Sequence, residues 1–579
     1  MSTATDPGLQ AEVSELHRES QDPALATDAR RAAVAERLSE LRLLYRRNPS
    51  AFSTEVLGML REIAGAVTVA ERGPERPSAP AQPPEEVLKD VFGYDSFRPG
   101  QREIIDAVLA GQDCVGVMPT GSGKSLTYQV PAIALGRFAL VVSPLIALMK
   151  DQVDALTEAG VSATFLNSTL SFDERRERIA DIAAGKHRLV YAAPEGLEAS
   201  VGRLLSEVRP SLIAIDEAHC ISEWGHDFRP AYRNLSSLKR RFGNVPLLAL
   251  TATATPQVMR DIVQQLGMRA PTMFRGSFFR KNLRLSSFQK GESLGRTTRE
   301  AIASLVQSRP GESGIVYCLS RKSTEETADY LKEQGCRATC YHAGLAPEQR
   351  AKAQDAFRND DVDVVVATIA FGMGIDKSNV RYVIHRDLPK SVEGYYQEIG
   401  RAGRDGAPSD CILFYSWSEV VAYDRFADGT EDDAAAERLR SQAREMFRFA
   451  EASRCRHQLL AEYFGETMQK CGESCDVCRG KLTLPPKLRA SRRGSEAPSR
   501  APSTAVIAGA DAELLTLLKS LRLHLARERG LPAYLIFNDA TLLEMAVRKP
   551  KNEADLLQVP GVGPAKLEKY GDAFLKLFK

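Results

Sequence analysis

The sequence predicts an α/β protein in which two parallel β-sheets follow one another and smaller helical regions flank them. Between residues 85 and 418, short runs of Val, Ile, Leu and Ala alternate with helical stretches, as in parallel sheets covered on both faces. That stretch is too long for one such sheet, so we expect two consecutive domains that meet near residues 280–295. The composition, 43% hydrophobic and 26% charged residues, is typical of a soluble protein and excludes a collagenous or wholly disordered chain.

The apolar runs themselves mark the expected strands. In the first domain, residues 85–285, they are 113–117, 139–143, 189–193, 212–216 and 247–251. In the second domain, residues 286–418, they are 314–318, 363–368 and 382–385. Because helical stretches separate consecutive runs, we expect the strands of each sheet to be parallel.

Residues 1–84 precede these domains and carry a helical pattern over 30–65, which Pro49 is expected to interrupt. Prolines then crowd residues 73–84, which indicates an extended linker. Two interpretations of this region remain open: a small helical element that binds a protein partner, or a poorly ordered extension.

The region after the second domain is expected to be helical in two parts. Residues 419–480 predict a helical subdomain that ends in a cluster of cysteines, and residues 481–509, rich in Pro, Ser, Arg and Ala, predict a flexible tether. Residues 510–579 predict a small all-α domain. The leucines expected on one face of its first helix are Leu514, Leu517, Leu518, Leu521 and Leu525.

Charge is close to balanced overall but uneven along the chain. The net charge of +2 excludes a simple polycationic coat for nucleic acid, yet the tail from Arg479 onward holds 18 basic and 10 acidic residues. That tail is either a DNA-facing surface or ordinary solvated surface. No apolar run is long enough for a membrane span, and the first residues lack a secretion signal. We therefore expect an intracellular protein, cytoplasmic and nucleoid-associated if bacterial.

A phosphate-binding loop follows the first expected strand. Residues 118–125 read Met-Pro-Thr-Gly-Ser-Gly-Lys-Ser between a strand and a helix, which is the setting of a P-loop, although methionine replaces its first glycine. Its glycines let backbone N–H groups turn towards phosphate oxygens, and the helix N-terminus adds a favourable dipole. We expect Lys124 to reach the β- and γ-phosphates of a nucleotide and Ser125 to bind Mg²⁺. The candidate nucleotide-binding residues of this loop are Thr120, Gly121, Ser122, Gly123, Lys124 and Ser125.

Two adjacent carboxylates end the expected strand 212–216. Asp216 is expected to hold the Mg²⁺ shell and Glu217 to polarise the attacking water, a division that phosphoryl transfer requires. An acidic pair at a strand end is often only solvated, but its place after a P-loop favours catalysis. The run Asp-Glu-Ala-His, together with the P-loop, resembles the superfamily 2 helicases.

Further motifs of that superfamily follow along the chain. Residues 251–253, Thr-Ala-Thr, resemble the motif that couples hydrolysis to domain movement, and Gln397, Arg401 and Arg404 lie in a helicase-like arginine motif. Guanidinium groups suit a transferring γ-phosphate, so we expect both arginines to act as arginine fingers from the second domain. ATP would then draw the domains together, and hydrolysis would release them.

The residues before the P-loop give a finer resemblance. The segment 92–101 is similar to the adenine-recognition motif of the RecQ family of DNA helicases. The resemblance implies that Gln101 makes paired hydrogen bonds to adenine while Tyr94 and Arg98 pack beside the base, so that ATP is the nucleotide. It extends over 86–480 and 510–579 and implies two RecA-like motor domains, 3′→5′ movement and roles in DNA recombination and repair.

An aromatic-rich loop follows the acidic motif. In RecQ helicases the loop that it resembles senses single-stranded DNA, which implies DNA contacts for Trp224, His226, Phe228 and Arg229. The chemistry fits, because aromatic rings stack on unpaired bases and Arg contacts phosphate. An ordinary core cluster of aromatic residues is the alternative.

Four cysteines crowd together near the end of the helical subdomain. Four thiolates at this spacing predict one closed, structural Zn²⁺ site, and the pattern resembles the RecQ zinc-binding subdomain. Unliganded thiols or disulfides are the alternative. The predicted ligands are Cys455, Cys471, Cys475 and Cys478.

Residues 510–579 resemble the HRDC domain, in which a glycine turn at 559–563 would present N–H groups to phosphate. Typical RecQ proteins carry a winged-helix domain before HRDC, whereas 481–509 here leaves no room for one. The resemblance implies a monomeric Mg-ATP-dependent helicase acting on single-stranded and tailed duplex DNA. Alternatives are an ATP-switched DNA-binding scaffold, a pure single-strand translocase, or an RNA helicase.

Overall fold

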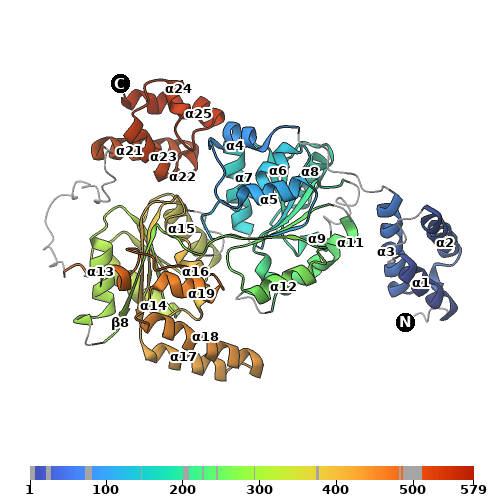
Figure 1. Ribbon diagram of the computed structural model, residues 1–579, viewed down its shortest axis with the longest axis horizontal. Helices are drawn as coiled ribbons and strands as arrows, with labels where there is room; N and C mark the ends of the chain where they lie inside the picture. The colour runs from blue at the N-terminus through green and yellow to red at the C-terminus, as the bar shows by residue number, and fades with distance from the viewer. Residues whose placement is uncertain are drawn as a thin grey trace.

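The computed structural model describes residues 7–20, 28–71, 81–144, 146–167, 169–199, 208–223, 227–242, 245–291, 294–372, 377–480, 484–486 and 511–578. Two α/β domains lie side by side, and a group of C-terminal helices lies across one end of both (Figure 1). A bundle of N-terminal helices stands beside the first domain, on the side away from the second. The predicted fold class, two parallel sheets with helical flanking parts, is confirmed.

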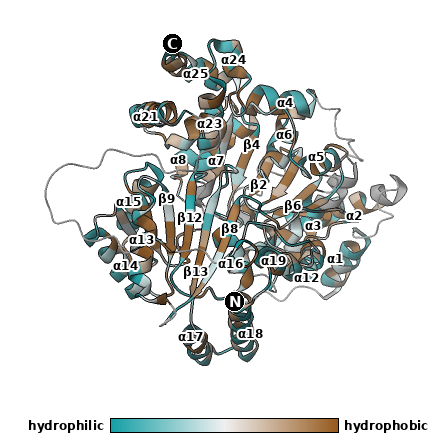
Figure 2. Ribbon diagram, turned by 60° about the vertical axis from the view of Figure 1, so that its left-hand side comes forward, coloured by the Kyte–Doolittle hydropathy of each residue, from teal (hydrophilic) through white to brown (hydrophobic). Residues whose placement is uncertain are grey.

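The first domain is built on a seven-stranded parallel sheet with the order β3-β4-β2-β5-β6-β1-β7. Its strands are β1 (Cys114–Val117), β2 (Ala139–Val142), β3 (Ala163–Leu166), β4 (Leu189–Ala192), β5 (Leu212–Ile215), β6 (Leu247–Thr251) and β7 (Thr272–Arg275). Every residue of the five inner strands is buried, and Figure 2 shows β2, β4 and β6 as largely hydrophobic. The edge strands β3 and β7 are partly exposed and lack a continuous apolar run, so the sequence did not predict them.

Helices cover this sheet, and loops at its carboxyl edge connect the strands to these helices. They are α4 (Pro84–Phe92), α5 (Gln101–Leu109), α6 (Leu126–Ala134), α7 (Ile146–Glu158), α8 (Phe172–Ala183), α9 (Gly196–Ala199), α11 (Leu238–Phe242) and α12 (Pro256–Gln265). Local sequence explains where several begin: α8 starts at a capping box in which Ser171 and Glu174 satisfy each other's backbone N–H groups. Short 3₁₀ turns, η3 (Ala218–Ile221) and η4 (Pro230–Ser237), follow β5.

The second domain contains a six-stranded parallel sheet with the order β10-β11-β9-β12-β13-β8. Its strands are β8 (Leu283–Gln289), β9 (Ser313–Tyr317), β10 (Ala338–Tyr341), β11 (Val364–Ala367), β12 (Val380–His385) and β13 (Ser409–Tyr415). Its helices are α13 (Thr298–Gln307), α14 (Arg321–Glu333), α15 (Pro347–Arg358) and α16 (Val392–Ile399). The chain passes from the first sheet to the second through residues 276–282, between β7 and β8.

The remaining helices form three separate groups. The N-terminal bundle comprises α1 (Pro7–Ser20), α2 (Asp28–Arg47), the 3₁₀ turn η2 (Pro49–Ala51) and α3 (Thr54–Glu71), and it has its own apolar core. After the second sheet come α17 (Trp417–Asp428), α18 (Asp433–Glu451), α19 (Arg456–Tyr463) and α20 (Asp476–Arg479). The C-terminal group is α21 (Ala512–Arg529), α22 (Ala533–Ile536), α23 (Asp539–Arg548), α24 (Glu553–Leu557), α25 (Pro564–Leu575) and η6 (Lys576–Phe578).

Two details of the helical parts refine the sequence analysis. The N-terminal residues 7–20 and 28–71 form packed helices, which favours the helical interpretation of this region over a poorly ordered extension. In α21, Leu514 and Leu518 are buried, but Leu517 is 54% exposed, so its expected place on the apolar face is wrong. Within the described residues, no helix is long and apolar enough to cross a membrane.

Candidate ATP site and zinc centre

The P-loop connects the buried strand β1 to helix α6 at the carboxyl edge of the first sheet. Gly121 and Gly123 have φ values of 80° and 81°, in the left-handed region that favours glycine. A Cβ atom on Gly123 would lie 2.4 Å from Gln101 Nε2, so the loop packs too closely there for a side chain. The Lys124 Nζ is buried and has no hydrogen-bond partner among the described residues, as expected of a cation that awaits an anion. This loop is therefore shaped to bind phosphate.

The acidic pair follows β5 and lies against the same cavity as the P-loop. Glu217 has φ 48° and ψ 45°, a left-handed conformation that costs a non-glycine residue free energy and is typical of functional sites. Its Oε2 lies 3.4 Å from His219 Nδ1, and that ring nitrogen is hydrogen-bonded to Thr251 Oγ1 at 2.8 Å. Thr251 ends β6, so the acidic motif and the Thr-Ala-Thr motif are in direct contact. A displacement of either motif would therefore change the hydrogen bond between His219 and Thr251.

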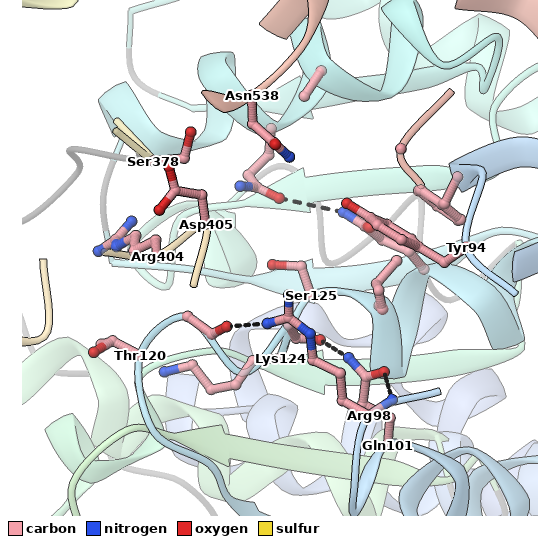
Figure 3. Close-up of a pocket in the computed structure, with 18 of the residues that line it drawn as sticks. Tyr94, Arg98, Gln101, Thr120, Lys124, Ser125, Ser378, Arg404, Asp405 and Asn538 are labelled. Carbon is pink, nitrogen blue, oxygen red and sulfur yellow. Dashed lines mark hydrogen bonds between the residues drawn. The ribbon is translucent and has the colours of Figure 1, made fainter. Parts of the chain in front are cut away.

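The three residues expected to recognise adenine line the cavity, but two of them, Arg98 and Gln101, donate hydrogen bonds to the P-loop (Figure 3). Gln101 Nε2 donates to Ser122 O at 3.1 Å and to Gly123 O at 2.9 Å, and its Oε1 accepts from Arg98 N at 2.9 Å. The Arg98 guanidinium donates to Gly121 O. Burial raises the pKa of Tyr94. In this structure Arg98 and Gln101 hold the P-loop from the side on which a base is expected.

The arginine motif reaches the P-loop from the second domain. Arg401 and Arg404 follow α16, and a Cβ atom built on Gly121 would lie 3.2 Å from Arg404 Cα. Arg401 is buried and donates to Gly372 O. Figure 3 shows Arg404 across the cavity from Tyr94. The two domains therefore meet directly at the expected phosphate position.

The sequence-predicted ATP-site residues converge on one cavity of about 690 Å³. Those that line it are Tyr94, Arg98, Gln101, Thr120, Gly121, Gly123, Lys124, Ser125, Asp216, Glu217, Gln397, Arg401 and Arg404. Ser122 is the exception, because its hydroxyl turns back and donates to Pro119 O at 2.6 Å. Segments separated by up to three hundred positions in the sequence thus form one site that combines a free lysine, two carboxylates and two arginines. Such a site can bind a nucleoside triphosphate and stabilise phosphoryl transfer.

The aromatic-rich loop is only partly described, since Trp224 and His226 lie outside the described residues. Phe228 is half-buried, and the Arg233 guanidinium lies 5.0 Å from its ring centroid. Arg229 donates to Asp227 Oδ2 at 3.1 Å and to Pro144 O at 3.1 Å. Arg229 therefore links this loop to the loop after β2.

The four predicted zinc ligands come together. The Sγ atoms of Cys455, Cys471, Cys475 and Cys478 all lie within 4.8 Å of one another. His457 is not among them: its Nε2 is hydrogen-bonded to Leu283 O at 3.1 Å and Ser474 O at 3.2 Å. Four sulfurs at this spacing fit a closed tetrahedral zinc site, which is structural because it leaves no position for water.

The C-terminal helices take part in the ATP-site cavity, which the sequence did not indicate. Tyr534, Asn538, Thr541, Glu544 and Lys566 line it, and Figure 3 shows Asn538 among the residues around the cavity. No local pattern distinguishes these residues from ordinary helix and loop positions, so no sequence signal could have identified them.

Specific contacts hold the C-terminal helices in place. Lys569 Nζ and Tyr570 Oη both donate to Glu158 Oε2, at 3.2 and 2.8 Å. Gly561 N donates to Gly93 O at 2.9 Å, so in this structure the glycine turn faces the first domain rather than a phosphate. Arg527 forms an ion pair with Asp361 of the second domain at 3.2 Å. The C-terminal helices therefore contact both α/β domains.

Comparison with known proteins agrees with this architecture. Family models match the chain as a DEAD/DEAH box helicase at residues 98–262, a helicase conserved C-terminal domain at 297–406, a RecQ zinc-binding domain at 417–479 and an HRDC domain at 511–577. The ATP-dependent DNA helicase RecQ of Pasteurella multocida is 38% identical, over 85% of this chain and 93% of its own. The chain belongs to the RecQ family. The RecQ protein of Bacillus subtilis is 36% identical, over 85% of this chain and 98% of its own.

More distant similarities add little. A mimivirus protein described as a putative ATP-dependent RNA helicase is 41% identical, over 68% of this chain and 72% of its own. The solved structure of Mycobacterium smegmatis helicase Lhr bound to ssDNA and AMP-PNP covers 58% of this chain and 48% of its own, at 23% identity and a TM-score of 0.47. A structural similarity this low carries no argument about function.

The zinc-binding and HRDC matches lie close together in this chain. The zinc-binding match ends at residue 479 and the HRDC match begins at 511, an interval too short for a winged-helix domain. The alignment with the Pasteurella RecQ is 598 positions long, but it includes only 85% of this 579-residue chain. The other positions are residues of that relative that have no equivalent in this chain. The family models thus account for the motor domains, the zinc-binding region and the HRDC domain, and the interval between residues 479 and 511 is too short to hold a winged helix.

Proposed function

We propose that this RecQ protein is an ATP-dependent DNA helicase that moves 3′→5′ along single-stranded DNA and unwinds tailed duplexes in recombination and repair. One observation carries the proposal: Lys124 and the acidic pair of one motor domain share a cavity with the two arginines of the other. In such a site the chemistry depends on how closely the two domains approach. ATP turnover can therefore be converted into domain movement.

The roles of the residues follow from their positions. Lys124 neutralises the β- and γ-phosphates, and Glu217 orients the attacking water. Arg401 and Arg404 stabilise charge on the transferring phosphoryl group from the second motor domain. Ser125, at the start of α6, and Asp216, at the end of β5, both line the cavity and offer oxygen ligands, so they fit Mg²⁺. Mg²⁺ bound there supplies charge neutralisation for the phosphates.

Adenine recognition and DNA sensing would require side chains that bond to protein groups in this structure to bind the ligand instead. Tyr94 and Arg98 would pack beside adenine, and nucleotide binding would exchange the P-loop bonds of Gln101 for bonds to adenine. The loop that holds Trp224 and His226 would report single-stranded DNA, with Phe228 stacking on bases. Arg229 would relay this contact, because it bonds to Pro144 O in the loop after β2. We further propose that the protein acts as a monomer and that its N-terminal bundle binds a protein partner.

Without room for a winged helix between the zinc-binding and HRDC matches, duplex binding would be arranged differently in this chain. The zinc subdomain and the HRDC domain remain as candidates for duplex contacts. Because the HRDC glycine turn bonds to Gly93 O, we propose that HRDC reaches DNA only after leaving the first motor domain.

The ATPase response to nucleic acid tests this proposal. Turnover is measured with single-stranded DNA, with RNA of the same sequence and with no nucleic acid. Strong stimulation by DNA and weak stimulation by RNA supports a DNA motor. Stronger stimulation by RNA would contradict it, and so would a turnover rate that no nucleic acid changes.

A further inference from the structure

Arg280 lies where the chain crosses from the first motor domain to the second. It belongs to the segment between β7 and β8, outside both matched helicase regions, 98–262 and 297–406. No motif in the sequence singles it out. Its side chain nevertheless reaches the P-loop, which lines the ATP-site cavity.

The Arg280 guanidinium binds both walls of the cleft at once. On the first motor domain, Nη1 donates to Thr120 O of the P-loop. On the second, Nη2 donates to Ala402 O at 3.1 Å and to Gly403 O at 2.8 Å, the two residues between the arginine fingers. A planar guanidinium has donors that diverge in a fixed geometry, so one side chain can hold these carbonyl groups at a set separation.

A second residue, Asn282, attaches Arg280 to the second motor domain. Arg280 Nε donates to Asn282 Oδ1 at 3.3 Å, while Asn282 Nδ2 donates to Gly403 O at 2.9 Å and to Ala407 O at 3.0 Å. Asn282 thus ties the arginine to the second motor domain through several bonds, whereas a single carbonyl holds it to the P-loop. Fewer hydrogen bonds therefore attach Arg280 to the P-loop than to the second motor domain.

The electrostatics of the position favour an anionic ligand. Among the described residues, no carboxylate lies within ion-pair distance of Arg280, and all its acceptors are neutral oxygens. Burial lowers the pKa of its guanidinium, and the positive charges of Arg404 and Arg98 add to this effect. Three guanidinium groups therefore surround the P-loop, and nucleotide phosphates would relieve their mutual repulsion.

We propose that Arg280 is a positioning residue that latches the P-loop to the arginine-finger turn when ATP closes the cleft. It acts through Arg401 and Arg404, because it fixes the carbonyl groups of the turn that carries them. This inference rests on the proposed ATPase motor and adds a part that the known motifs do not contain.

The test is Arg280→Lys, which keeps the positive charge but cannot reach carbonyl groups on both walls. We expect the DNA-stimulated kcat to fall by roughly 10- to 100-fold, as for loss of a charged hydrogen bond in the closed state. The affinity for ADP should stay within a few-fold of wild type, whereas the affinity for ADP with aluminium fluoride, which mimics the transferring phosphoryl group, should fall with kcat. The unfolding temperature should not change.

Arg275→Lys provides a matched control. Arg275 is also a partly buried arginine near the same crossing, but it donates to Gly465 O of the zinc subdomain and stacks on Phe278, away from the P-loop. This variant should keep both kcat and aluminium fluoride affinity. An Arg280→Lys kcat within about threefold of wild type would overturn the latch, and so would equal losses of ADP affinity, kcat and unfolding temperature. A wild-type protein without ATP turnover would instead refute the proposed function itself.

Discussion

Substituting Gly400 with alanine should prevent the motor domains from closing without disturbing either one alone. Gly400 ends α16 with φ −60° and ψ −15°, a helical conformation that alanine adopts freely. A Cβ atom there would lie 2.0 Å from Thr120 Oγ1 and 3.1 Å from Thr120 Cβ, both across the cleft. The added methyl group also lies 3.1 Å from Tyr396 O of its own domain, a milder contact that is present in either state, whereas the clash with the P-loop arises only when the cleft is closed.

The size of the effect follows from the cost of overpacking. An extra methyl group in a packed contact costs about 1–3 kcal/mol. At about 1.4 kcal/mol for each factor of ten, the closed population should fall by roughly 5- to 150-fold. The assay is DNA-stimulated ATP turnover, with ATP affinity measured separately. We expect kcat to fall by that factor while nucleotide affinity stays close to wild type, because the first motor domain still binds the nucleotide.

A double variant separates the clash from any other effect of Gly400→Ala. The Thr120 Oγ1 atom is buried without a hydrogen-bond partner among the described residues, so Thr120→Ala breaks no hydrogen bond within the protein, and its own turnover is the reference for the double variant. In the Gly400→Ala background it removes the clashing atom and should restore most of the lost turnover. Wild-type turnover in Gly400→Ala alone would refute the closed-cleft reasoning, as would a loss that Thr120→Ala leaves unchanged.

The remaining predictions concern the P-loop, the zinc centre and the HRDC contact. Lys124→Ala should abolish ATP turnover and leave single-stranded DNA binding measurable by fluorescence anisotropy; retained turnover would disprove the P-loop assignment. Cys475→Ala should release zinc and lower the unfolding temperature, because structural zinc binding contributes about 10 kcal/mol of folding free energy; one zinc per chain in this variant would contradict the four-sulfur site. Glu158→Ala removes the acceptor of Lys569, a partly exposed pair worth about 1 kcal/mol, and should increase the undocked HRDC fraction about fivefold. Energy transfer between labels on HRDC and the first motor domain measures that fraction, and unchanged transfer would show that the contact does not hold HRDC.

Local sequence patterns predicted the inner parts of the fold better than its edges. Runs such as 212–216 and 247–251 are buried on both faces, so their continuous apolar character marks them as strands. The strands β3, β7, β8 and β10 occupy sheet edges, where partial exposure interrupts the apolar run. Residues 409–415, which form β13, begin with two polar residues and escaped notice for a related reason.

The candidate site shows the same division between local and long-range information. The P-loop, the acidic pair and the cysteine cluster are each encoded in a short contiguous segment, and the sequence was enough to identify them. Arg280 bonds to the P-loop and Lys566 lines the ATP-site cavity only because the two motor domains and HRDC pack together, and packing of this kind leaves no local pattern. The same packing explains why the HRDC glycine turn, expected to face phosphate, bonds to Gly93 O.

Strand displacement on tailed duplexes tests the central claim most directly. The full-length protein is mixed with Mg-ATP and a duplex carrying a single-stranded tail at either the 3′ or the 5′ end, and the released strand is measured. We predict ATP-dependent release from the 3′-tailed duplex, little release from the 5′-tailed duplex, and none with Lys124→Ala. Intact DNA-stimulated ATP turnover without release from the 3′-tailed duplex would contradict the helicase assignment and favour a translocase or an ATP-switched scaffold.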